Sequence, residues 1–201
     1  MHRICLVHLA WIILGGIIVA TNVAIAQTDL KQEVEKRIKK SEMPSAALNY
    51  LSEHWLNESR KIRYYYETDG ANISYEAKLI REKRRFSIEF DSSGSLQDIE
   101  ELIDYEQIPA SVQANIDLTL SQKYSKYRIQ RVQRQFLPDT TQQNALLHFS
   151  GLTTETVDNF EIEIDTQEGS AVQSYEMLFN VEGLLVQRRT IIRRSLDNFL
   201  Y

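Results

Sequence analysis

The sequence predicts an α+β protein made of tandem units, each with one helix and about four antiparallel strands. Three observations predict this class. Apolar residues recur at helical spacing after Pro44 and after Pro109, alternating apolar and polar residues follow each of these segments, and the same order of motifs occurs twice along the chain. We expect the helices to cover one face of the sheet and the other face to remain open to water.

Two segments are predicted to be amphipathic helices. Proline suits the first turn of a helix, where its missing N–H is not needed, so each helix begins next to a proline. An earlier charged segment, residues 30–38, is also predicted to be helical. The apolar residues that define the two main helices are Ala47, Leu48, Leu51, Trp55 and Leu56 in the first, and Val112, Ile116, Leu120 and Tyr124 in the second.

Strict alternation predicts the strands that follow the helices. Residues 73–79 and 86–90 alternate in the first unit, and residues 160–164 alternate in the second. Turns are predicted at 91–94 and 180–183, where Gly94 and Gly183 can adopt a positive φ. Further strands are predicted at 62–67, 96–103 and 128–136, the last with an interrupted alternation at Ile129 and Val132.

The order of these motifs indicates a duplicated unit. Aligning Gly94 with Gly183 brings residues 86–103 onto residues 175–192, and the segments around Pro44 and Pro109 then correspond as well. The sequence therefore divides into a signal peptide (1–26), an N-terminal helical or flexible segment (27–42), a first unit (43–107) and a second unit (108–201) with an insertion near 137–158.

The first 26 residues have the features of a secretory signal. Basic Arg3 precedes an apolar run that ends in Ala24-Ile25-Ala26, and small residues at these positions fit a signal peptidase. An uncleaved membrane anchor is the alternative. Cleavage would remove Cys5, the only cysteine, so we expect an exported bacterial protein, periplasmic or secreted, without disulfides and without stable membrane insertion.

Composition and motifs argue against several function classes. A net charge of −5 has the wrong sign for a protein that binds nucleic acid by neutralising phosphates. The expected mature chain has two histidines, His54 and His148, and neither a nucleophile elbow nor a cysteine. We therefore expect no catalytic residues, no metal site and no cofactor.

Several of these motifs resemble the PepSY-like, β-lactamase-inhibitor-protein-like family of exported bacterial proteins. The resemblance covers about residues 43–192 and is carried by the segments 73–78, 85–91, 94–96, 100–103 and 108–109. It implies helix-plus-four-strand units and a non-enzymatic binding or inhibitory role, with no catalytic residues to carry over. The inhibitors of this shape have disulfides, whereas the expected mature chain has no cysteine.

The predicted function is that of an exported, non-catalytic binding or inhibitor-like protein that presents an open sheet face to a protein or peptide. The alternatives are an envelope hydrolase or an accessory sensor subunit of a membrane system. Alternation places polar residues on the open face, where acidic side chains would favour a cationic partner and a tyrosine could act as an anchor. The predicted partner-binding residues are Tyr65, Glu76, Lys78, Arg85, Glu89, Glu161 and Glu163.

Overall fold

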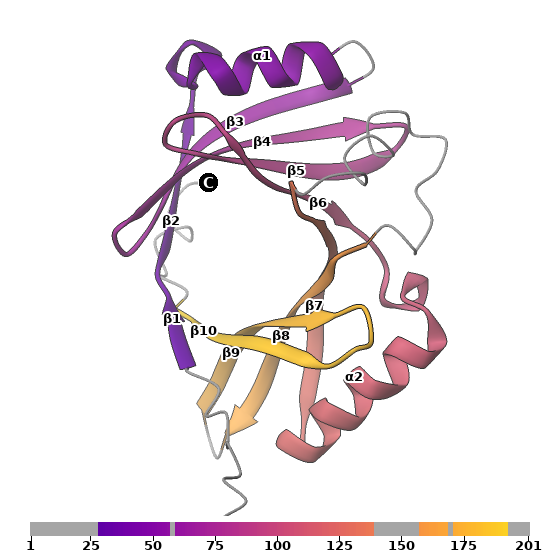
Figure 1. Ribbon diagram of the computed structural model, residues 1–201. Helices are drawn as coiled ribbons and strands as arrows, with labels where there is room; N and C mark the ends of the chain where they lie inside the picture. The colour runs from indigo at the N-terminus through magenta and orange to yellow at the C-terminus, as the bar shows by residue number, and fades with distance from the viewer. Residues whose placement is uncertain (1–27, 57–58, 139–156, 169–170, 193–201) are drawn as a thin grey trace, which may run out of the picture.

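The computed structural model describes residues 28–56, 59–138, 157–168 and 171–192 (Figure 1). Strands dominate this part of the chain, and only two α-helices accompany them. The helices are α1 (Ser45–His54) and α2 (Ala110–Lys123). The strands are β1 (Thr28–Lys31), β2 (Glu33–Ile38), β3 (Ser59–Asp69), β4 (Asn72–Arg81), β5 (Arg84–Asp91), β6 (Leu96–Leu102), β7 (Tyr127–Phe136), β8 (Asn159–Glu168), β9 (Ala171–Asn180) and β10 (Leu185–Ile191).

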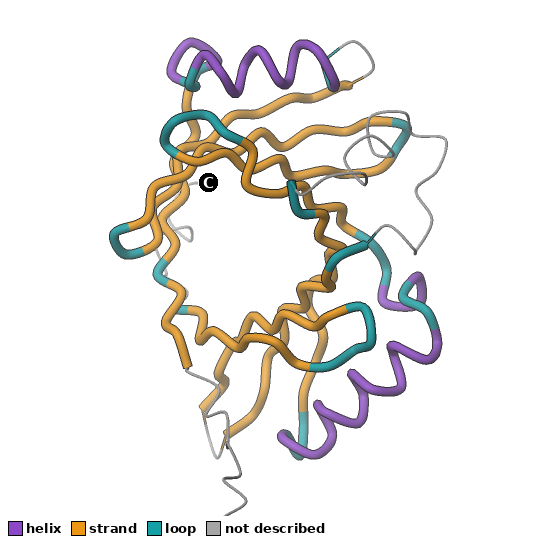
Figure 2. The backbone as a smooth tube through the Cα atoms, viewed as in Figure 1, coloured by secondary structure: helices purple, strands orange, loops and turns teal. Residues whose placement is uncertain are grey.

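All ten strands belong to one sheet that curls into a nearly closed ring (Figure 2). Its order is β1-β10-β9-β8-β7-β6-β5-β4-β3-β2. The chain crosses from the first half to the second where β6 pairs with β7, with Ile99 opposite Phe136. The predicted α+β arrangement of tandem helix-plus-sheet units is therefore wrong, since more than half of the described residues are strand and all the strands belong to one continuous sheet. Hydrogen bonds between β6 and β7, which local sequence patterns do not reveal, join the two expected sheets.

One N-terminal segment brings the two ends of the sheet together. Only Gln32 separates β1 from β2, yet β1 pairs in parallel with β10 while β2 pairs antiparallel with β3. The prediction of a helix or flexible segment over this region is wrong. Leu30, Val34 and Ile38 fit a helical period. The two edge strands of the sheet, however, would otherwise have backbone N–H and C=O groups without partners, and this segment forms strands that pair with them.

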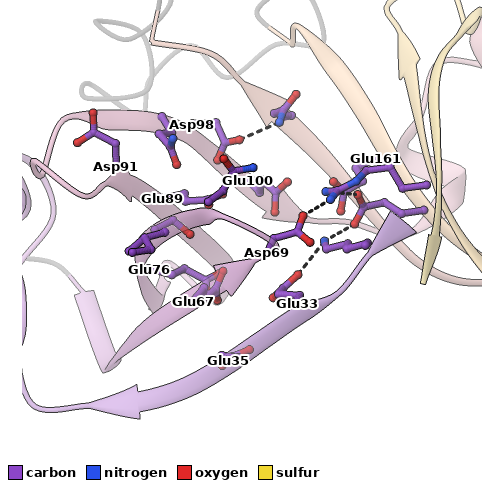
Figure 3. Close-up of a pocket in the computed structure, with 18 of the residues that line it drawn as sticks. Glu33, Glu35, Glu67, Asp69, Glu76, Glu89, Asp91, Asp98, Glu100 and Glu161 are labelled. Carbon is purple, nitrogen blue, oxygen red and sulfur yellow. Dashed lines mark hydrogen bonds and ion pairs between the residues drawn. The ribbon is translucent and has the colours of Figure 1, made fainter. Parts of the chain in front are cut away.

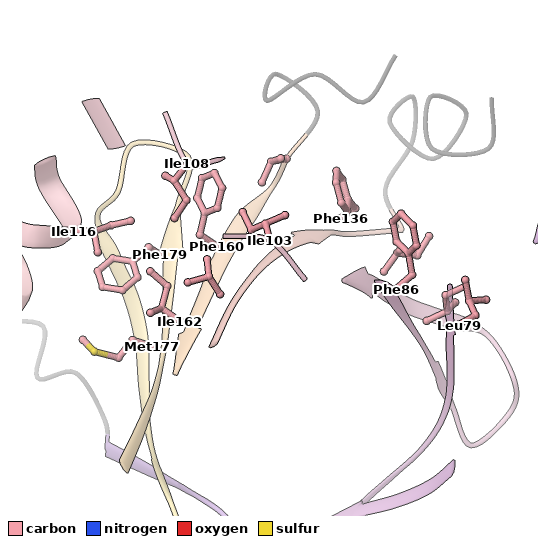
Figure 4. Close-up of a cluster of buried hydrophobic side chains, with 14 of the residues drawn as sticks. Leu79, Phe86, Ile103, Ile108, Ile116, Phe136, Phe160, Ile162, Met177 and Phe179 are labelled. Carbon is pink, nitrogen blue, oxygen red and sulfur yellow. The ribbon is translucent and has the colours of Figure 1, made fainter. Parts of the chain in front are cut away.

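The apolar core lies between the helices and the outer face of the sheet (Figures 1 and 4). Phe86, Ile88 and Phe90 are buried, and the Phe86 ring lies 5.1 Å from the Trp55 ring at the end of α1. The predicted apolar face of this strand is thus confirmed. In the second half, the rings of Tyr124 and Tyr175 stack 5.7 Å apart.

The local predictions for the helices and several strands are confirmed. Pro44 and Pro109 cap the N-termini of α1 and α2. The strand predicted with an interrupted alternation is β7, and a bulge between Ile129 and Arg131 accounts for the interruption.

The polar face of the sheet is not the open surface that the sequence predicts. The curvature of the sheet turns this face inward, so the polar side chains surround a cavity. Within the described residues, the helices are too short and too polar to cross a membrane. The signal peptide at 1–26 and most of the insertion near 137–158 lie outside the described residues.

Candidate functional site

A cavity of about 740 Å³ lies on the concave side of the ring (Figure 3). Its lining contains eleven carboxyl groups and four cationic groups, an excess of seven carboxyls. We call it the acidic cavity. The carboxyl groups belong to Glu33, Glu35, Glu67, Asp69, Glu76, Glu89, Asp91, Asp98, Glu100, Glu161 and Glu176, and the cations to Lys31, Lys78, Arg131 and Arg189.

Strand alternation and pairing bring these acids together. Side chains two residues apart on a strand share a face, so Asp98 and Glu100 both point inward from β6. Glu76 on β4 is directly opposite Glu89 on β5, and Glu89 is directly opposite Asp98. Like charges in opposed positions destabilise a sheet. This arrangement is therefore unfavourable in the isolated protein.

Glu67 and Glu76 are the most deeply buried part of the first half of the acidic cavity. They are 8% and 7% exposed. Ser87 donates a hydrogen bond to Glu76, and Lys78 Nζ lies 2.9 Å from a Glu76 oxygen. Glu67 Oε1 has no hydrogen-bond partner among the described residues. Burial first, and then the hydrogen bond and charge of Glu76, raise the pKa of Glu67 to about 10.

Three further carboxyl groups have strongly raised pKa values. Burial and then the charge of Glu89 raise the pKa of Asp98 to about 7. Burial and then Asp98 raise the pKa of Glu100 to about 8. For Glu161, burial and then Glu100 raise the pKa well above its usual range. The acidic cavity contains too few cations to offset the cost of burying charged carboxylates, so the neutral forms are favoured and the pKa values rise.

Lys31 and Arg189 supply cations where the ring closes. Lys31 on β1 forms ion pairs with Glu176 on β9 and, at 2.9 Å, with Glu33. Arg189 on β10 pairs with Asp69 at the end of β3 and lies 3.8 Å from Glu176. Burial opposes the charge of Lys31, but the surrounding carboxylates, Glu176 first, raise its pKa overall. These ion pairs link strands from both ends of the sheet.

The structure brings the seven predicted partner-binding residues to the concave face. Glu76, Lys78, Glu89 and Glu161 line the acidic cavity. Tyr65 is opposite Glu76, and Lys78 Nζ lies 4.8 Å from the centre of its ring. Arg85 lies in a second cavity that also includes Lys78. Glu163 accepts a hydrogen bond from Arg131 at 3.2 Å, so it is engaged in an ion pair.

Several cavity residues were missed by the sequence reasoning. The helix predicted over residues 30–38 concealed Lys31, Glu33 and Glu35, since no sheet face was assigned to that segment. Glu100 is not among the residues predicted to bind a partner. The alternation around Ile99, which is buried against the helices, was the signal that could have placed Asp98 and Glu100 on the inner face.

The described residues give little support for a metal site or for a catalytic histidine. Glu33, Glu35 and Glu67 have ligand atoms within 4.8 Å of one another. Lys31 and Lys78 lie 2.9 Å from Glu33 and Glu35, so ammonium groups already occupy this cluster. His54 lies on α1, outside the ring, and His148 is outside the described residues.

Solved structures resemble this fold. A protein of Bacteroides eggerthii, assigned provisionally to the periplasm, matches 79% of this chain and 99% of its own, at 14% identity and a TM-score of 0.51. A DUF2874 family protein of Bacteroides uniformis matches 73% of this chain and 88% of its own, at 13% identity and a TM-score of 0.50. A BLIP-like protein of Bacteroides fragilis matches 76% of this chain and 90% of its own, at 15% identity and a TM-score of 0.47.

These similarities concern the fold alone, since each identity is below 25%. No protein-family profile matches the sequence, and no curated protein does either. The predicted resemblance to β-lactamase-inhibitor-like exported proteins stays a prediction, and none of these neighbours shows a PepSY relationship.

Proposed function

We propose that the protein is an exported, non-catalytic binding or inhibitor-like protein that takes a basic segment of a protein or peptide into its acidic cavity. The excess of seven carboxyls in this cavity carries the proposal. The fold likeness to a provisionally periplasmic protein is consistent with export. The non-catalytic part rests on the sequence, which has no nucleophile motif.

The energetics of the buried acids favour a cationic ligand. Glu67 is almost fully buried, has an oxygen without a hydrogen-bond partner and points into the cavity (Figure 3). A lysine or arginine side chain entering the cavity would offer hydrogen bonds to such oxygens and favour their charged form. Binding would release protons from groups such as Glu67 and Glu100, so affinity should increase with pH.

The shape of the cavity restricts the kind of partner. Its volume of about 740 Å³ lies in the range typical of sites for small molecules or short segments. A globular partner could not lay a flat surface against a face that curves into a ring. We therefore expect an inserted loop or chain end to make the contacts.

Peptide titration tests this proposal. A fluorescent Lys-Arg-rich tetrapeptide should bind at least about tenfold more tightly than its Glu-rich counterpart. The variant Glu89→Gln/Glu161→Gln should lose most of this preference, and added salt should weaken binding. Glu106→Gln, at an exposed position outside the cavity, is the matched control. Equal binding of the two peptides, or unchanged binding by the double variant, would refute the proposal.

A further inference from the structure

The concave face holds a second cavity with the opposite charge. It has a volume of about 480 Å³, and its charged lining residues are all basic: Lys61, Arg63, Lys78, Arg85 and Arg131. We call it the basic cavity. Lys78 and Arg131 also line the acidic cavity, so the two cavities adjoin.

The basic cavity lies at the opposite end of the same strands. On β3, Arg63 lines the basic cavity while Glu67 and Asp69 line the acidic one. On β5, Arg85 lines the basic cavity and Glu89 the acidic one. The concave face is thus divided into an acidic end and a basic end.

Within the described part of the chain, three of the five cations of the basic cavity lack a carboxylate partner, whereas Lys78 and Arg131 form ion pairs. Lys61, Arg63 and Arg85 are exposed and form no ion pair with any described residue, while Arg63 lies directly opposite Lys78. Like charges opposite each other are unfavourable in a sheet. An anionic ligand would offset this repulsion, and exposed cations at the mouth would also steer it inward.

Two local features support a binding role. Gln133 lines this cavity, is 2% exposed, and has an Oε1 atom without a hydrogen-bond partner among the described residues. Lys61 has a φ of 54° at a bulge between Arg60 and Arg63. A left-handed residue other than glycine is strained, and such strain is concentrated at functional sites.

We propose that the basic cavity binds the terminal carboxylate of the peptide segment whose basic side chains occupy the acidic cavity. This inference rests on the proposed function. A carboxylate suits arginine because guanidinium and carboxylate can form two parallel hydrogen bonds. Gln133 Oε1 would accept a hydrogen bond from a backbone N–H near the peptide end. The site would then select chain ends over internal loops.

The test compares two peptides of the same basic sequence, one with a free carboxyl terminus and one amidated. The free form should bind at least about tenfold more tightly to the unaltered protein. In Arg63→Gln/Arg85→Gln the two forms should bind alike. Lys123→Gln, an exposed change on α2 outside both cavities, should leave the preference intact.

Inorganic phosphate distinguishes a terminal carboxylate from a free anion. Phosphate should compete with the free-carboxyl peptide more strongly than with the amidated one. Phosphate binding that depends on Arg63 and Arg85, together with indifference to amidation, would assign the cavity to a free anion and overturn this inference. Tight but amidation-insensitive binding would refute only this inference, whereas no binding of either peptide would refute the proposed function too.

Discussion

At the scale of single residues, two turn glycines connect the sheet to its helices. Gly94 and Gly183 have φ values of 87° and 77°. A Cβ atom on Gly94 would lie 2.8 Å from the Pro44 side chain next to α1, and one on Gly183 would lie 2.6 Å from the Val112 backbone oxygen in α2. Each turn therefore needs glycine for two reasons: it tolerates a positive φ, and it has no Cβ atom that would clash with the helix.

Alanine at these positions should destabilise the fold. The positive φ alone costs about 1–2 kcal/mol for an alanine, and the clash with a helix adds to it. We expect Gly94→Ala and Gly183→Ala each to lower the free energy of unfolding by about 2–4 kcal/mol in urea titrations. Gly70→Ala is the matched control, because Gly70 has a φ of 61° with no atom within 4 Å of an added Cβ. Equal losses in all three variants would show that the helix contacts are unimportant.

The buried carboxyls should give the protein an unusual pH dependence. The pKa of Glu100 rises from 4.5 to about 8 on folding, so the folded state binds more protons than the unfolded state between these pH values. Stability should therefore fall as pH rises from about 5 to 8, by on the order of 1 kcal/mol per pH unit. Urea unfolding at several pH values measures this slope.

Glu100→Gln should make the slope smaller, while Glu67, Asp98 and Glu161 still titrate. The new amide removes the titrating group, while its oxygen can still accept the hydrogen bond from Gln133 Nε2. Glu106→Gln, which changes an exposed acid, should leave the slope as it is. A protein that becomes more stable between pH 5 and 8 would contradict the raised pKa values.

At the scale of elements, the β1–β2 segment determines whether the ring stays closed. Lys31 is 20% exposed and its partner Glu176 is 7% exposed, so their ion pair is largely removed from water. Without Lys31, the buried Glu176 carboxylate would keep only the more distant Arg189, 3.8 Å away, as a compensating cation among the described residues. We expect Lys31→Met to increase amide exchange in β1 and β10 at least about tenfold, with β4 and β5 unchanged.

Lys36→Met provides the control for this change. Lys36 lies on β2 of the same segment, is exposed and lines neither cavity. Its replacement should leave the exchange of β1 and β10 as in the unaltered protein. Faster exchange in β4 and β5 after Lys31→Met would indicate general destabilisation and not local opening.

The same segment shows what the sequence could and could not predict. Alternation over residues 75–79 and 86–90 identified the buried face correctly, because each side chain's direction depends on its own strand, whereas Ile73 at the start of the first segment is exposed. The pairing of β1 with β10 joins residues about 160 positions apart, such as Thr28 and Arg188, and no local pattern encodes it. The acidic cavity depends on that closure, so only Glu76, Glu89 and Glu161 of its eleven acids were predicted as binding residues, and none as part of an enclosed group.

At the scale of the whole molecule, the two halves should unfold together. Each helix packs on its own half, but β6–β7 pairing and the β1–β2 segment join the halves at both ends. Two units with separate sheets could unfold independently, whereas a single ring loses pairing in both halves when either opens. Unfolding of residues 27–201 should therefore be one cooperative transition.

Trp55 allows a direct test. It is the only tryptophan outside the expected signal peptide and is buried against Phe86 in the first half, so its fluorescence reports on that half. Leu51→Ala in α1 and Ile116→Ala in α2 each remove a fully buried side chain and should cost about 2–5 kcal/mol. If the ring unfolds as a unit, Ile116→Ala should shift the Trp55 transition in urea about as far as Leu51→Ala does.

Leu118→Ala, at an exposed position on α2, should shift it little. A Trp55 transition that moves with Leu51→Ala but not with Ile116→Ala would show that the halves are independent.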